Sequence, residues 1–224
     1  MNLPVVEDLA TRACATCEGP CCTVHEVPIT GFDLFRLTRG LSVPWRSLVR
    51  LDAHRVPLFD GFRLDQGPDH HFFLLHRRPS GACQLLVEIP ERGGLPTYRR
   101  CGVHSLRPGA CRVYPLLPDR EQGAAWGDHA ICPDPARALY RAGVAELQPV
   151  VDEAAAERAL YTHLRQRWDL VAMRVPTSRP LPPDRFIEFC TEVYRAIEPL
   201  RQGERGQWQL QAYSMINEFA LPTP

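Results

Sequence analysis

Cysteine is the residue whose placement most constrains how this chain can fold. Nine cysteines occur among 224 residues, and only Cys190 lies beyond residue 132. The other eight are Cys14, Cys17, Cys21, Cys22, Cys83, Cys101, Cys111 and Cys132. No apolar run has the length of a signal peptide or a membrane span, so we expect a cytoplasmic protein with no membrane partner. A reducing cytosol disfavours structural disulfides, and the thiols therefore predict metal ligands or redox groups.

The first cysteine cluster spans residues 14–22 and reads CATCEGPCC. Two residues between Cys14 and Cys17 let both sulfurs turn toward one ion, as in zinc knuckles and ferredoxin loops. The Gly-Pro step inside the cluster allows a tight turn that leaves backbone N–H groups free to point at sulfur. Side chains of successive residues diverge, so we expect Cys21 and Cys22 to serve two neighbouring sites or one multinuclear site.

The second cluster spans residues 101–115 and reads CGVHSLRPGACRVYP. It adds Cys101 and Cys111 to the candidate ligands. Four thiolates around Zn²⁺, or around a [4Fe–4S]²⁺ core, leave a net charge of about −2. Arg107 and Arg112 are predicted cofactor-binding residues that contact the thiolate ligands rather than the metal itself. Their guanidinium groups can offset the negative charge and donate hydrogen bonds to sulfur.

Cys83 and Cys132 complete a predicted set of eight metal-binding cysteines. Both lie far from the other ligands along the sequence, so the chain must fold before their sulfurs can meet them. His104 and His129 are weaker candidates, since a lone histidine near a cysteine more often lies at the surface or behind the ligands. Cys190 falls on the apolar face of a predicted helix, which indicates a buried core thiol.

The order of these motifs resembles that of the YkgJ-like cysteine-cluster family, described as a zinc- or iron-chelating domain. The resemblance covers about residues 14–132 and implies metal binding by this region. His104 stands where the family often carries an aromatic residue, and residues 91–100 resemble an insert. Relatives of this domain occur within flagellin lysine methylases, which implies that the cluster can support catalysis. The matching residues, in chain order, are Cys21-Cys22, Ile29–Leu37, Cys83, Cys101, Arg107-Pro108, Cys111-Arg112, Tyr114-Pro115 and Cys132.

The fold class predicted from these patterns is α+β. An irregular cysteine-rich metal-binding domain with short strands and helices is expected over residues 1–135, and a helical region over residues 136–224. A helix is expected to begin at Thr30, with Asp33 completing a capping box, and to end at Gly40. The other predicted elements are strands at 58–64, 70–75 and 84–89 and helices at 136–147, 150–171, 184–200 and 208–219, with a kink or break at Pro149.

Charge and composition exclude several classes of function. The chain has 26 basic and 26 acidic residues. It lacks the basic stripe that nucleic-acid binding usually needs, so no nucleic-acid partner is expected. All 26 basic residues are Arg, so the chain has no Schiff-base lysine and no phosphate-loop lysine.

Three functions agree with the sequence. The first is a metal-binding protein that holds an iron–sulfur cluster or zinc through eight cysteines in a structural or redox role. A redox partner protein is one possible partner for the redox role. The second is a cluster-dependent enzyme related to lysine N-methylases, which needs an open coordination position or a neighbouring cofactor cavity. The third, a metal chaperone, is less favoured because the dispersed cysteines meet only in a folded chain. The loops rich in Gly and Pro favour an iron–sulfur cluster slightly, and the nearby histidines favour zinc.

Overall fold

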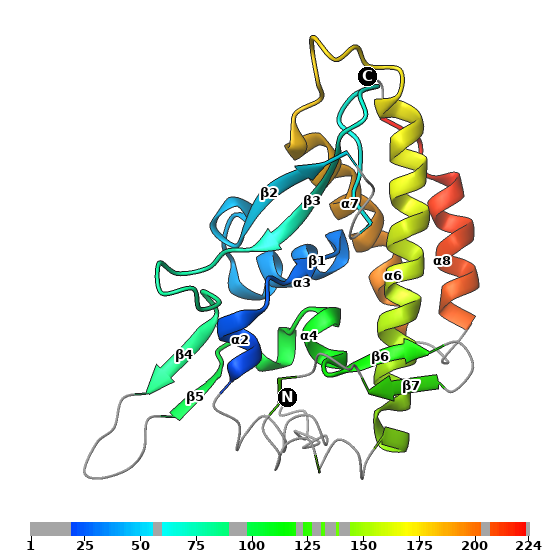
Figure 1. Cartoon of the computed structure of the whole chain (residues 1–224). Coiled ribbons are helices and arrows are strands. Elements are labelled where there is room, and N and C mark those ends of the chain that lie inside the picture. Colours follow the sequence, from blue (N-terminus) through cyan, green and yellow to red (C-terminus); the bar gives the residue numbers. More distant parts are fainter. Residues whose placement is uncertain are drawn as a thin grey trace. The chain divides into compact units, whose positions relative to one another are not determined.

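The computed structural model describes residues 19–55, 60–89, 98–119, 123–126, 131–132, 138, 144–202 and 207–222 (Figure 1). The chain is mixed α+β, as predicted, and its C-terminal part is mainly helical. Two compact units interleave along the sequence. Unit 1 comprises Met1–Val27 and His76–Ala155, and unit 2 comprises Pro28–Leu75 and Ala156–Pro224. The domain boundary predicted at residue 135 was placed after the last clustered cysteine in the sequence. It stays a prediction.

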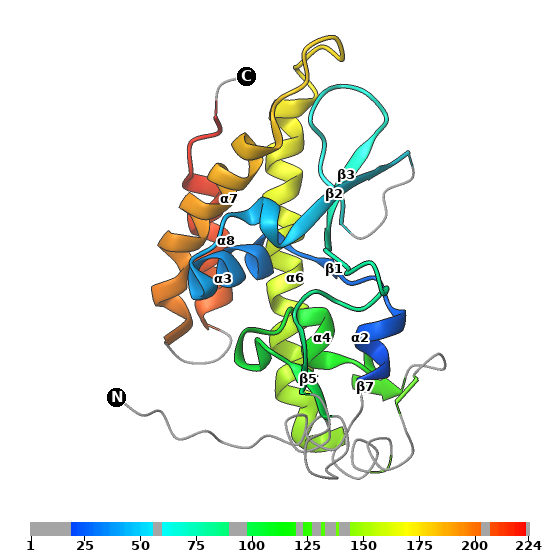
Figure 2. The same cartoon turned by 90° about the vertical axis from the view of Figure 1, so that its left-hand side faces the viewer.

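Unit 2 contains a three-stranded antiparallel sheet with strand order β1-β3-β2. These strands are β1 (Pro28–Ile29), β2 (Val49–His54) and β3 (His70–Leu75). The helical elements of the unit are α3 (Gly31–Leu41), η1 (Trp45–Ser47), α7 (Pro183–Ile197), η3 (Glu198–Gln202), α8 (Gln207–Glu218) and the C-terminal part of α6 (Val144–Ala172) (Figure 2).

The start of α3 confirms the predicted capping box. The Thr30 hydroxyl accepts a hydrogen bond from the Asp33 N–H, and the Asp33 carboxylate accepts one from the Thr30 N–H, each at 3.1 Å. Two of the backbone donors that a helix start leaves unpaired are thereby satisfied. The helix ends at Leu41, one residue after the predicted end, and Ser42 follows in a left-handed conformation.

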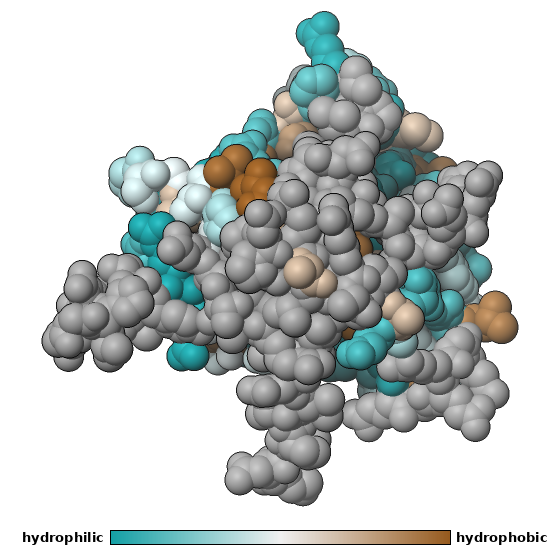
Figure 3. Space-filling model, turned by 60° about the horizontal axis from the view of Figure 1, so that its bottom comes forward, coloured by the Kyte–Doolittle hydropathy of each residue, from teal (hydrophilic) through white to brown (hydrophobic). Residues whose placement is uncertain are grey.

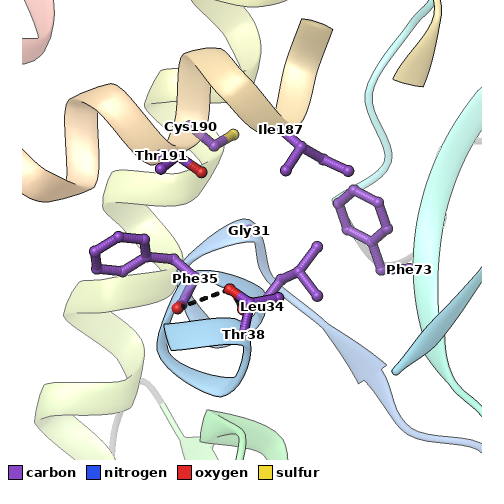
Figure 4. A pocket seen from close by; sticks show the side chains of 8 residues that line it. All are labelled: Gly31, Leu34, Phe35, Thr38, Phe73, Ile187, Cys190 and Thr191. Carbon is purple, nitrogen blue, oxygen red and sulfur yellow. Dashed lines mark hydrogen bonds between the residues drawn. The ribbon is translucent and has the colours of Figure 1, made fainter. Parts of the chain in front are cut away.

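Aromatic side chains form the core of unit 2. Phe62, Phe73 and Phe186 are fully buried, and the rings of Phe62 and Phe186 stack with centroids 3.8 Å apart. Cys190 is also buried, as predicted for a core thiol. Figure 4 shows Cys190 and its α7 neighbours facing α3 across a cavity of about 10 Å³, which is too small for a cofactor.

Unit 1 is built from short elements. They are α2 (Pro20–Val24), β4 (Leu86–Ile89), β5 (Tyr98–Cys101), η2 (His104–Leu106), α4 (Gly109–Val113), β6 (Leu116–Asp119), β7 (Gly123–Trp126) and the N-terminal part of α6. The strands pair as two separate antiparallel hairpins, β4 with β5 and β6 with β7. Elements of four or five residues bury little surface by themselves, so unit 1 depends on contacts between segments.

Several predicted elements differ from the structure. The strand at 70–75 is confirmed, and the strand at 84–89 begins at Leu86. The strand predicted at 58–64 is wrong for the described residues 60–64, where Phe62 makes an isolated bridge to His71. Pro149 lies inside helix α6 instead of ending it, so the predicted break is wrong. In the second turn it removes the i→i−4 hydrogen bond to the Ala145 carbonyl oxygen, and the predicted kink stays a prediction.

The face of the molecule drawn in Figure 3 shows where hydrophilic and apolar residues lie. In the view of Figure 3 the described residues are mainly hydrophilic, and apolar groups form small patches. Among the described residues, no helix combines the length and apolar character that crossing a membrane requires.

Candidate metal centre

Helix α2 presents the Cys21-Cys22 pair. Gly19 precedes it with φ at 69°, a conformation that glycine adopts without strain, and Pro20 supplies a preset φ for the first helical turn. The thiols of Cys21 and Cys22 are hydrogen-bonded to each other. Whether the pair serves two neighbouring sites or one multinuclear site stays a prediction.

The mutual hydrogen bond separates the acidities of the two thiols. Donation from Cys22 lowers the pKa of Cys21 to about 7, and the positive charge of Arg107 acts in the same direction against the effect of burial. The same hydrogen bond and burial both raise the pKa of Cys22. Negative charge on Cys83 or Cys111 raises the pKa of Cys22 as well. One easily ionised thiol and three further thiols thus share one electrostatic environment.

Cys83 is hydrogen-bonded to α2 through its backbone. Its backbone N–H donates a 2.7 Å hydrogen bond to the carbonyl oxygen of Cys22. The guanidinium group of Arg77 holds the same two segments together, since it donates to the carbonyl oxygens of Thr23, Val24 and Gly81. Cys83 itself is buried, and burial raises the pKa of its thiol.

Cys101 is placed beside Cys83 by backbone pairing. It ends β5 opposite Leu86 in β4, and the Leu86 N–H donates to the Cys83 carbonyl oxygen at 3.0 Å. Gly102 then donates to the Leu85 carbonyl oxygen at 2.8 Å. A Cβ atom on Gly102 would lie 3.1 Å from that oxygen and 2.7 Å from a Val87 methyl group, so only glycine allows this close crossing.

Cys111 and Cys132 are joined to the pair on α2 through Tyr114. Cys111 lies on α4, and Tyr114 forms the C-terminal cap of that helix. The Tyr114 hydroxyl accepts a 2.8 Å hydrogen bond from the N–H of Ile131, the residue before Cys132. It also lies 3.2 Å from Nε2 of His25, the C-terminal cap of α2.

The two predicted cofactor-binding arginines differ in their surroundings. Arg107 is buried, its Nε donates to the His104 carbonyl oxygen at 3.1 Å, and its charge acts on Cys21. Arg112 lies on the same helix as Cys111 and forms a long ion pair, 3.9 Å, with Glu153. The position of Arg107 suits neutralisation of thiolate charge, and the role of Arg112 stays a prediction.

The described part of the chain gathers six of the eight predicted ligands in unit 1. Within that part, no three His, Cys, Asp or Glu side chains are arranged as a metal site. Cys14, Cys17 and the candidate His129 lie outside the described residues. Backbone and side-chain hydrogen bonds connect the cysteine-bearing segments. The predicted ligands present in unit 1 are Cys21, Cys22, Cys83, Cys101, Cys111 and Cys132.

Sequence reasoning missed the contributions of Arg77 and His25 to the contacts between these segments. The turn residues Pro79 to Gly81 between Arg77 and Cys83 were the available signal, because Gly81, with φ at 83°, lets the chain return and Arg77 pair with Cys83. His25 comes three residues after Cys22 and caps the C-terminal end of α2, so it lies close to the Cys21-Cys22 pair.

The described cysteines of unit 1 lie on or beside short helices and strands of a mixed α+β fold. Comparison of the chain with protein-family models, with curated proteins and with solved structures found no match. The resemblance to the YkgJ-like family therefore stays a prediction.

Proposed function

We propose that unit 1 is a metal-binding module that holds an iron–sulfur cluster or zinc through its cysteines, in a structural or electron-transfer role. The observation that carries the proposal is the direct link between Cys83 and the Cys21-Cys22 pair, with Cys111 in the same electrostatic environment. Thiols from three distant parts of the sequence are close enough to alter one another's ionisation.

The chemistry of the donor set agrees with this proposal. Thiolate is the ligand form of cysteine, and a thiol whose pKa is about 7 loses its proton at little cost near neutral pH. The buried guanidinium of Arg107 supplies positive charge where several thiolates would accumulate negative charge. Bound metal would supply either an electron acceptor or a cross-link between the short elements of unit 1.

The experiment is elemental analysis of the full chain, purified without oxygen and without chelators. An iron–sulfur protein would be brown, with absorbance near ~400 nm and iron and sulfide in comparable amounts. A colourless protein with stoichiometric zinc would support the zinc form. Neither metal at a stoichiometric level would overturn the proposal.

A further inference from the structure

The hydroxyl group of Tyr114 connects three segments that each carry candidate ligands. It accepts the Ile131 N–H at 2.8 Å and lies 3.2 Å from His25 Nε2. The His25 and Tyr114 rings meet edge to face, with centroids 5.2 Å apart. One oxygen atom therefore joins the end of α2, the end of α4 and the backbone beside Cys132.

We infer that Tyr114 is a positioning residue for the proposed metal centre, an inference that rests on the proposed function. Helices α2 and α4 have five residues each, so neither is stable without tertiary contacts. The cysteines on them keep a fixed relation only if the helix ends are tied together. The Tyr114 hydroxyl lies at the C-terminal ends of both helices.

The chemistry of a phenol suits this connection. A phenolic oxygen can accept one hydrogen bond while its own proton is donated to another group. Here the Ile131 N–H is the donor, and neutral His25 with its proton on Nδ1 can receive the phenol proton on Nε2. A phenylalanine at position 114 would keep the ring and lose both hydrogen bonds.

Three single substitutions test the inference. Tyr114→Phe removes both contacts, and His25→Phe removes one while retaining an aromatic ring beside Tyr114. Tyr194→Phe is the matched control, because its hydroxyl is buried in unit 2 with no hydrogen-bond partner among the described residues. Each full-length protein would be purified anaerobically, analysed for metal and challenged with excess chelator.

We expect metal release from Tyr114→Phe to be about tenfold faster than from the unsubstituted protein, the usual size of an effect from a group behind the ligands. His25→Phe should fall between the two, and Tyr194→Phe should match the unsubstituted protein. If the bound metal is an iron–sulfur cluster, the visible or electron-paramagnetic spectrum of the loaded Tyr114→Phe protein should also shift, which a general loss of stability would not produce. For zinc, which has no such spectrum, the comparison with Tyr194→Phe makes this distinction.

The outcomes separate this inference from the proposed function. A metal-containing parent protein whose release rate and spectrum are unchanged by Tyr114→Phe would overturn the inference alone. Equal acceleration by Tyr194→Phe would overturn it too, since the effect would then reflect general loosening. A parent protein without metal would overturn both.

Discussion

The backbone N–H of Cys83 donates a 2.7 Å hydrogen bond to the carbonyl oxygen of Cys22, although the two residues lie far apart in the sequence. This bond links two segments that carry predicted ligands without using either sulfur. Because backbone atoms make this connection, the thiol groups of Cys22 and Cys83 are not needed for it and could bind metal. Arg77 reinforces the link with donors to both segments.

Cys21→Ser and Cys111→Ser should each lower the amount of bound metal clearly, because serine lacks the soft thiolate that zinc and iron–sulfur clusters require. Cys190→Ser is the matched control, since Cys190 is buried in unit 2. Metal per chain measured by elemental analysis is the test. Unchanged metal in both ligand variants would contradict their assignment, and loss of metal in Cys190→Ser would show that the ninth cysteine was misjudged.

Gly102→Ala should destabilise unit 1 by about 1–3 kcal/mol, the usual cost of overpacking. The new Cβ would lie 2.7 Å from a Val87 methyl group, so β5 or β4 must shift. Adding Val87→Ala removes that methyl group and should restore part of the stability, although the Leu85 carbonyl oxygen stays close. Urea unfolding of the single and double variants measures this, and a double variant no more stable than Gly102→Ala would count against the proposed clash.

Alkylation of the metal-free protein should show a reactive thiol whose rate is half-maximal near pH 7. The pKa of Cys21 is lowered to about 7, so this thiol is about half ionised there, while an ordinary cysteine is mostly protonated. Its rate should rise through that pH and level off above it. Mass spectrometry after iodoacetamide treatment at several pH values locates the modified residue.

Cys22→Ala is the informative variant for this titration. It removes the thiol whose hydrogen bond is the main cause of the lowered pKa of Cys21, so the midpoint should move to higher pH. A midpoint that stays near pH 7 in Cys22→Ala would assign the lowered pKa to another group, with Arg107 the next to test.

Glu157→Ala should destabilise unit 2 by about 3 kcal/mol, since it removes the buried carboxylate that accepts from both Arg36 and Arg201. Glu157 is buried and accepts from Arg36 at 3.0 Å and from Arg201. Both guanidinium groups also lie over the Phe32 ring, at 5.0 and 4.7 Å from its centroid. The loss would therefore weaken the packing of both side chains, while Arg36 keeps its 2.7 Å ion pair with Asp33.

Glu188→Ala on the exposed face of α7 is the control for this measurement and should change stability by less than about 0.5 kcal/mol. Urea unfolding followed by circular dichroism gives both free energies. Equal stability of the two variants would mean that the buried ion pairs contribute nothing net to folding.

Local patterns predicted the elements whose signals lie within a few residues. The Thr30–Asp33 capping box, the strand at residues 70–75 and the buried stripe of α7 follow from capping chemistry and apolar spacing, and each is confirmed. The hairpin of β6 and β7 was not predicted, because its residues carry few strand-forming side chains and pairing stabilises them only across the two strands.

The sequence by itself determined which residues could act as thiolate ligands, that α+β elements would carry them, and that Cys190 would be a core thiol. Only the tertiary structure decided which segments meet: Cys83 against Cys22, Cys101 beside the residues after Cys83, and Tyr114 between His25 and Ile131. The physical reason is that hydrogen bonds between distant segments depend on loop closure and packing of the whole unit, for which residue spacing carries no local signal.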